Sequence, residues 1–315
     1  MAPEENYKLV EDLYKESEEC KTVALDNVVC ILTCQNRKPS LLDTLSEITS
    51  DVYVYIYESE EHLYEWLEQE NVTKVCVPDA YRSCQKMRHF IGEHMSECPD
   101  KMYWELDDDL LCGYVSCKTK KTSVWKTLKV TEGIIKHCNA YDYEVLQVNM
   151  CDISAKFWNG KYLIRGCEFP HQCMLINKER LENLNIRFTG DATVHEDVEL
   201  AIEVYKKGGK LGAVEGVLVT PLNDPKKSIA SNDEHLKDLV FDGYQKFGEW
   251  CKLVPKKNRE VLQVHVNRPN CKNEKKLKYD KELLRLCKKR DFKKVYEHVV
   301  KRKNKEVIPE YKFKR

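Results

Sequence analysis

Apolar and polar positions in the first third of the chain form short apolar runs that alternate with longer segments of helical period. Residues 27–33, 51–57, 73–78 and 101–106 are rich in Val, Ile and Tyr, which predicts four strands. Residues 40–48, 59–70 and 80–95 carry apolar residues at three- and four-residue spacing, which predicts helices, with Ser40 or Ser59 as plausible caps. This alternation predicts an α/β fold with a mostly parallel sheet covered on both faces.

Three adjacent aspartates, Asp107, Asp108 and Asp109, directly follow the fourth predicted strand. In a parallel α/β sheet, ligands bind beyond the carboxyl ends of the strands. Side chains alternate along extended backbone, so Asp107 and Asp109 can face one way and Asp108 the other. Two converging carboxylates favour a hard cation, Mg²⁺ or Mn²⁺, bound by few carboxylates plus substrate phosphates. A solvated acidic turn or a helix-capping cluster is the alternative.

A second acidic pair, Glu196 and Asp197, begins a segment with apolar residues at helical spacing. Gly208 and Gly209 follow that segment and predict the end of the helix. Acidic residues in a first turn are also stabilised by the helix dipole. Taken alone, this pair therefore does not indicate a site.

Composition limits the class of protein. The chain has 315 residues, 42% hydrophobic and 33% charged, which is typical of a globular protein with one large domain and an appendage. Its start has no apolar signal region, and no segment approaches 18 uninterrupted apolar residues, so we expect a cytoplasmic protein without a membrane span. The 15 cysteines lack paired C-x-x-C spacing, which favours reduced thiols over a zinc site.

The net charge is zero, but it is unevenly distributed. Residues 252–315 hold about 23 Lys and Arg against about 8 Asp and Glu, so the body of the chain is acidic. A basic, mainly helical C-terminal region is either a solvated extension or a surface for a phosphate-rich partner.

Taken together, these motifs resemble one enzyme class. A first strand leads into Thr33-Cys34-Gln35-Asn36-Arg37-Lys38-Pro39, a second ends in "YESEE", a fourth ends in "ELDDDL", and "HEDVELAIEVYKKGGKLG" follows about ninety residues later. Their order and spacing over residues 25–222 resemble the GT-A class of nucleotide-sugar glycosyltransferases, whose fold is a Rossmann-like, mostly parallel sheet flanked by helices. The resemblance implies a helical lead-in over 1–24, a GT-A domain over 25–235 and a basic helical extension over 236–315.

The resemblance also implies roles for particular residues. Asp109 and Asp107 would hold Mn²⁺ or Mg²⁺ against the diphosphate of a nucleoside diphosphate sugar, UDP-linked by this resemblance. Asp197 would take the proton from the acceptor hydroxyl, and Glu196 would shape its surroundings. His235 would be a third metal ligand, although amphipathic helix packing explains it equally well. The implied contacts to the nucleotide sugar are Thr33, Asn36, Arg37, Glu58, Arg88, Asp107 and Asp108.

The segment before Glu196 departs from the family pattern and leaves the acceptor site poorly defined. Trp158 and Arg165 are candidate acceptor contacts, although core packing is the commoner role of such an aromatic residue. The chain looks similar to bacteriophage TET-associated DNA glycosyltransferases, which implies hydroxymethylated pyrimidine in DNA as acceptor and the host cytoplasm as location. The candidate DNA contacts are then Lys288, Lys289, Arg290, Lys293 and Lys294.

Three other functions stay open from the sequence. One is a cytosolic glycosyltransferase that acts on a protein or a glycan. The second is a nucleotidyltransferase-like enzyme, which also binds metal through paired aspartates but needs a third carboxylate nearby. The third is a non-catalytic nucleic-acid-binding protein on an enzyme fold. The sequence does not indicate the sugar, the stereochemical course or an oligomeric state.

Overall fold

The structure is a computed structural model that describes residues 3–115, 120–150, 158–166, 172–188, 190, 196–222, 233–248, 250–255, 262–266 and 280–305. The chain divides into two compact units, Met1–Ala192 with Glu203–Asn223, and Thr193–Ile202 with Asp224–Arg315. Helix α6, Glu196–Lys206, therefore begins in the second unit and ends in the first. The predicted boundary at residue 235 falls inside helix α7, Asp233–Phe247.

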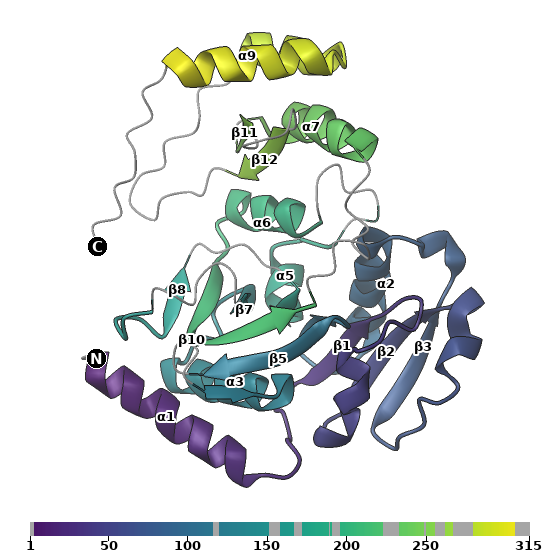
Figure 1. The fold of residues 1–315 in the computed structure, drawn as a ribbon, viewed down its shortest axis with the longest axis vertical. Helices are drawn as coiled ribbons and strands as arrows, with labels where there is room; N and C mark the ends of the chain where they lie inside the picture. The colour runs from purple at the N-terminus through teal and green to yellow at the C-terminus, as the bar shows by residue number, and fades with distance from the viewer. Residues whose placement is uncertain are drawn as a thin grey trace. The chain divides into compact units, whose positions relative to one another are not determined.

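The first unit contains a 10-stranded sheet in which four strands from the start of the chain are parallel neighbours (Figure 1). Their order is β3-β2-β1-β4. The bounds are Val28–Leu32 for β1, Val52–Tyr57 for β2, Val72–Val77 for β3 and Met102–Asp107 for β4. All four strands predicted from the apolar runs are thus confirmed.

The sheet continues from β4 in the order β9-β7-β10-β5-β6, and β8 also pairs with β10. Strands β7 and β10 run parallel to the first four, whereas β9, β5 and β8 run in the opposite direction. The predicted α/β fold with a mostly parallel sheet is therefore confirmed. The bounds are Leu110–Val115 for β5, Lys120–Thr122 for β6, Val145–Met150 for β7, Ile164–Gly166 for β8, Cys173–Asn177 for β9 and Leu211–Pro221 for β10.

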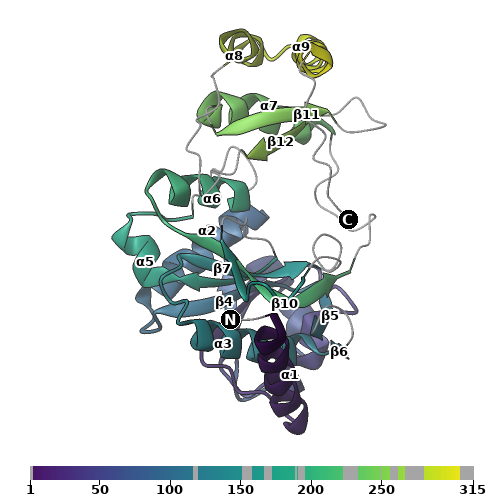
Figure 2. The same ribbon diagram turned by 90° about the vertical axis from the view of Figure 1, so that its left-hand side faces the viewer.

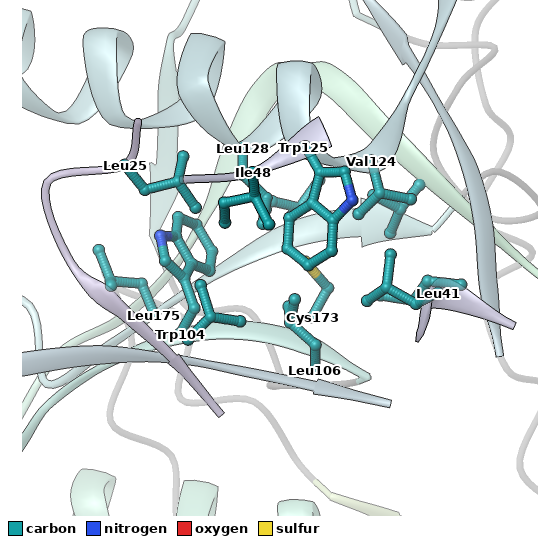
Figure 3. Close-up of a cluster of buried hydrophobic side chains, with 14 of the residues drawn as sticks. Leu25, Leu41, Ile48, Trp104, Leu106, Val124, Trp125, Leu128, Cys173 and Leu175 are labelled. Carbon is teal, nitrogen blue, oxygen red and sulfur yellow. The ribbon is translucent and has the colours of Figure 1, made fainter. Parts of the chain in front are cut away.

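Helices cover both faces of this sheet, as the alternation of apolar residues requires. On one face, Trp104 and Leu106 of β4 share a buried cluster with Trp125 and Leu128 of helix α3, Val124–Cys138 (Figure 3). On the other face, the Tyr55 hydroxyl lies 2.7 Å from Nδ1 of His94 in helix α2, Cys84–Glu97. Side chains of odd-numbered β4 residues therefore face α2.

Helix α1, Pro3–Glu19, belongs to the first unit and packs on α3. Leu13 of α1 lies against Gly133 of α3, where a Cβ atom would be only 2.6 Å from the Leu13 side chain. The Asn6 side chain is buried and donates to the carbonyl oxygen of Gly160 at 2.6 Å. This helix is therefore part of the packed core.

The helices predicted over 40–48 and 59–70 are 3₁₀ helices, η1 over Leu41–Glu47 and η2 over Glu58–Tyr64. The prediction that the second helix extends to residue 70 was wrong. Ser40 is the N-cap residue of η1. Ser59 does not cap η2, because it lies inside this helix and Tyr57 is the N-cap residue. The Ser59 hydroxyl donates to Asp79 Oδ1 at 2.7 Å. Ser83 caps α2 and accepts from the Lys86 N–H at 3.1 Å. Two short helices complete the unit, η3 over Asp79–Tyr81 and α5 over Lys178–Asn183.

The second unit contains α7, an antiparallel pair of strands and two C-terminal helices. These are β11 over Cys251–Pro255, β12 over Leu262–Val266, α8 over Lys281–Lys288 and α9 over Phe292–Lys305 (Figure 2). Phe241 of α7 belongs to one buried hydrophobic cluster with residues of α8 and α9, namely Leu283, Leu286 and Val295. The C-terminal region therefore has its own core and carries two strands besides its helices. Among the described residues, no helix combines the length and apolar character needed to cross a membrane.

Candidate functional site

The segments that follow β1, β2, β3 and β4 meet at one edge of the sheet, because parallel strands place their carboxyl ends together. The aspartate triplet is held at this edge by backbone hydrogen bonds to distant parts of the chain. The Asp108 N–H donates to the Leu32 carbonyl oxygen at 3.2 Å, and the Asp109 carbonyl oxygen accepts from the Leu222 N–H at 2.7 Å. The turn after β4 is therefore fixed by both β1 and the end of β10.

Asp108 is fully buried and faces the loop that follows β1. Its Oδ2 accepts from the Thr33 hydroxyl at 2.6 Å and from Arg37 Nε at 3.4 Å, and its Oδ1 pairs with Arg37 Nη2. Burial raises the pKa of the Asp108 carboxyl, and Arg37 together with the Thr33 hydroxyl opposes that shift. Thr33 and Arg37, which like Asp108 were predicted to contact the nucleotide sugar, thus both bond the Asp108 carboxylate.

The loop after β1 has an unusual backbone conformation. Gln35 and Asn36 have φ values of +59° and +45°, in the left-handed region that favours glycine. The Gln35 N–H donates to Glu60 Oε2 at 2.6 Å, and the Asn36 N–H donates to the Tyr64 hydroxyl at 2.8 Å. That hydroxyl also lies 2.9 Å from the Thr33 hydroxyl, and burial raises the pKa of Tyr64 to about 12. Helix η2 therefore holds the loop in place.

The acidic residues after β2 differ in their surroundings. Glu58, the predicted nucleoside contact, is exposed, whereas Glu60 is buried and paired with Arg82, which follows η3. The Arg82 guanidinium also lies 5.1 Å from the ring centroid of Tyr57. Sequence analysis did not identify Glu60 or Arg82, and no local pattern distinguishes Glu60 from its acidic neighbours.

Asp107 pairs with a different cation from Asp108. Arg88 of α2, whose side chain is 4% exposed, places Nη2 at 2.9 Å from Asp107 Oδ1 and Nη1 at 3.0 Å from Glu105 Oε1. Arg88 was predicted to contact the nucleotide sugar, and in the structure it pairs with these two carboxylates. Sequence analysis missed Glu105, although a charged residue inside an apolar strand, two positions before Asp107, was a usable signal.

Asp109 has the property expected of a ligand-binding carboxylate. Within the described residues, its Oδ1 is buried and has no hydrogen-bond partner. Burial raises the pKa of the Asp109 carboxyl, the Arg37 guanidinium lowers it, and the negative charge of Asp108 raises it. A buried carboxylate oxygen without a donor is costly unless a cation or a ligand donor satisfies it.

The carboxylates of Asp107 and Asp109 can supply only part of the ligand set of a hard divalent cation. The described residues include no group of three or more His, Cys, Asp or Glu side chains able to hold a metal ion. Mg²⁺ and Mn²⁺ commonly use one or two carboxylates, with phosphate oxygens and water completing the coordination. Asp109 and Asp107 supply carboxylates of that kind at the ligand-binding edge.

The second acidic pair lies at the start of α6, in the second unit. Glu196 and Asp197 are both partly exposed, and Asp197 Oδ1 accepts from the Val198 N–H at 2.7 Å. The helix ends as predicted, because Gly208 has φ +78° and allows the chain to turn. His235 lies in α7, but its side chain falls outside the described residues.

The two predicted acceptor residues make packing and ionic contacts within the first unit. The Trp158 ring centroid lies 4.6 Å from that of Tyr7 in α1, and Trp158 Nε1 donates to the Tyr162 carbonyl oxygen at 2.7 Å. Arg165 Nε lies 2.5 Å from Glu215 Oε1. These contacts do not involve an acceptor, and the acceptor role of Trp158 and Arg165 stays a prediction.

The predicted DNA contacts fall into two groups at the connection between α8 and α9. Arg290 pairs with Asp238 and Asp242 of α7, and Lys294 pairs with Asp291 at 2.8 Å. The second group is exposed and consists of Lys288, Lys289 and Lys293. We call these three residues the basic corner.

Comparison with protein-family models and with curated proteins found no significant match for this sequence. Among solved structures, the chain is similar to GalNAc-T7 with UDP, GalNAc and Mn²⁺ (11% identity, TM-score 0.44, 74% of this chain and 48% of that one). It is also similar to S. aureus TarS 1–349 (10%, 0.47, 90% and 92%) and to the same protein with UDP-GlcNAc (11%, 0.41, 69% and 66%). The chain spans about half the length of the GalNAc-T7 chain. Similarity at these identities and TM-scores does not assign a function to this chain.

Proposed function

We propose that this chain is a GT-A glycosyltransferase that moves a sugar from a nucleoside diphosphate sugar, UDP-linked in our proposal, to a hydroxyl acceptor. The observation that carries the proposal is the buried Oδ1 of Asp109 at the carboxyl edge of the parallel strands, which has no hydrogen-bond partner in the part of the chain that the structure describes. It lies in the motif that resembles the metal-binding carboxylates of this class. A bound Mn²⁺ or Mg²⁺ would neutralise the charge that develops on the leaving diphosphate.

The chain's own residues have separable tasks in this proposal. Asp109 and Asp107 hold the cation, and Thr33, Asn36 and Arg37 shape the loop that borders the diphosphate. Asp197 accepts the proton of the attacking hydroxyl, with Glu196 beside it on α6. The buried Asp108 supports the proposal indirectly, because its bonds to Thr33 and Arg37 hold that loop against the carboxylate turn.

The experiment is a calorimetric titration of UDP-sugars with Mn²⁺ or with chelator. Asp109→Asn should weaken cation-dependent binding by about tenfold or more, because the carboxylate charge is lost while the shape is kept. The matched control is Asp51→Asn, an exposed aspartate at the amino end of β2. Equal affinities in the wild type, with and without cation, and in Asp109→Asn would exclude this metal site.

For the acceptor, we propose hydroxymethylated pyrimidine in phage DNA, which would place the enzyme in the host cytoplasm. The basic corner supports a polyanionic acceptor, since three exposed lysines stand close together in sequence and form no ion pair among the described residues. A cytosolic protein or glycan acceptor needs no such surface. Incubation with labelled sugar nucleotides, and with modified or unmodified DNA, separates these acceptors.

A nucleotidyltransferase-like activity has weaker support. That chemistry needs a third carboxylate near Asp107 and Asp109. Glu105 is the nearest along β4, but its side chain is 0% exposed and paired with Arg88. Transfer of label from a nucleoside triphosphate, without transfer from any sugar nucleotide, would favour this alternative.

A further inference from the structure

Glu105 is a carboxylate inside the hydrophobic part of strand β4. Its neighbours Trp104 and Leu106 belong to the core on one face, whereas Glu105 points to the other face, toward α2. Asp107 lies two residues further along the same face, at the ligand-binding edge. Glu105 and Asp107 are therefore stacked along one side of β4, one below the edge and one at it.

A single guanidinium bridges these two carboxylates. Arg88 Nη1 lies 3.0 Å from Glu105 and Arg88 Nη2 lies 2.9 Å from Asp107, and the three side chains are 4%, 0% and 19% exposed respectively. Two carboxylates therefore share this one guanidinium. Glu105 is fully buried and Asp107 is partly exposed, so Asp107 is the carboxylate of this group that a cation can reach.

A buried carboxylate is costly to fold, and an apolar residue at position 105 would avoid that cost. With a neutral residue there, however, one of the two carboxylates that share Arg88 would be lost, and the Arg88 charge would offset more of the charge of Asp107. Charges interact strongly where water is excluded, so the presence of Glu105 changes the field at Asp107. The bridge also limits how far the Asp107 carboxylate can rotate.

We propose that Glu105 and Arg88 are positioning residues for Asp107, with Glu105 sharing the Arg88 charge so that Asp107 keeps its negative charge for a divalent cation. This inference rests on the proposed nucleotide-sugar function, because that function supplies the cation at this edge. Neither residue needs to touch the substrate. A purely structural bridge would stabilise the fold and leave cation affinity independent of the residue at position 105.

The test measures Mn²⁺ binding in the presence of UDP, from the electron paramagnetic resonance signal of free Mn²⁺, together with the thermal midpoint without metal. Glu105→Gln keeps the shape and removes the charge, so it should weaken Mn²⁺ affinity by about tenfold, with the thermal midpoint equal to or above that of the wild type. Glu105→Asp keeps the charge, so its Mn²⁺ affinity should stay within about threefold of the wild type.

The matched control is Glu132→Gln. Glu132 is another buried glutamate, but it accepts hydrogen bonds from the Asp26 N–H and the Asn27 N–H, just before β1 and therefore at the opposite edge of the sheet. Its substitution should leave Mn²⁺ affinity unchanged.

Each outcome decides the inference. Unchanged Mn²⁺ affinity in a folded Glu105→Gln, while the wild type binds Mn²⁺ with UDP, overturns it and leaves the proposed function standing. If Glu105→Gln does not fold, Glu105→Met takes its place: a loss of Mn²⁺ affinity of about tenfold in that folded variant supports the inference, and affinity within about threefold of the wild type overturns it. A wild type that binds no Mn²⁺ with UDP overturns the metal-dependent function and this inference with it.

Discussion

Arg37, in the loop after strand β1, forms an ion pair with the fully buried carboxylate of Asp108, in the turn after strand β4. The same carboxylate accepts a hydrogen bond from the Thr33 hydroxyl, so two segments more than seventy residues apart in sequence are joined at one point. The central aspartate of the triplet therefore organises the backbone around its two neighbours. This relationship separates the structural role of Asp108 from the proposed ligand-binding role of Asp109.

We expect Asp108→Ala to destabilise the first unit by about 3 kcal/mol, because it leaves the largely buried Arg37 guanidinium without its partner. The double variant Asp108→Ala with Arg37→Met should recover part of that loss, since no unpaired charge remains. Urea unfolding measures both free energies. A single-variant loss below about 1 kcal/mol would mean that the pair does not hold the loop.

Cation binding should depend on pH through Asp109. Burial, the main influence, raises the pKa of its carboxyl above the usual value, so this group gains its proton at a higher pH than an exposed aspartate. Mn²⁺ affinity should therefore fall on acidification before exposed aspartates titrate, and Asp109→Asn should remove that part of the dependence. Calorimetric titration between about pH 7.5 and pH 4.5 tests this expectation.

Stability without metal should show the opposite dependence on pH. A carboxyl with a raised pKa in the folded state binds its proton more tightly there than in the unfolded chain. Its contribution to stability is present below the unfolded pKa and is lost as pH rises through the raised folded value. The thermal midpoint of the wild type should therefore decline across that window relative to Asp109→Asn, and parallel curves for the two proteins would contradict the raised pKa.

Asp197 is the expected proton acceptor in the proposed reaction. Asp197→Asn keeps its shape and removes its basicity, so turnover should fall by about 10²–10⁴-fold while UDP-sugar affinity changes little. Glu203→Gln, a partly exposed acidic residue on the same helix, is the control and should keep its turnover. Normal turnover in Asp197→Asn would assign the proton to another group.

The basic corner and Arg290 should respond differently to substitution. Replacing Lys288, Lys289 and Lys293 with Gln should weaken duplex DNA binding and flatten its salt dependence, by a log-log slope of about 0.9 for each lost phosphate contact. Arg290→Gln should mainly lower the thermal midpoint, because Arg290 bonds Asp238 and Asp242 of α7. Unchanged DNA affinity in the triple variant would move the acceptor from DNA to a protein or a small molecule.

The sequence by itself determined the strands β1 to β4, because each is a short apolar run bounded by polar turns, and that pattern depends on local residues alone. It also placed the aspartate triplet at the carboxyl edge of the parallel strands, since parallel strands bring their carboxyl ends together. The end of α6 at Gly208 followed from the conformation that glycine tolerates.

Only the tertiary structure decided which partner each of these charged side chains has. Among the described residues, it leaves one buried oxygen of Asp109 without a hydrogen-bond partner and pairs Asp108 with Arg37. It also pairs Arg88 with both Asp107 and Glu105. Neighbouring acidic residues look alike in sequence, whereas burial and the approach of a cation from a distant element set their charge and their partners. Those partners come from loops and helices many residues away, so local pattern alone could not predict them.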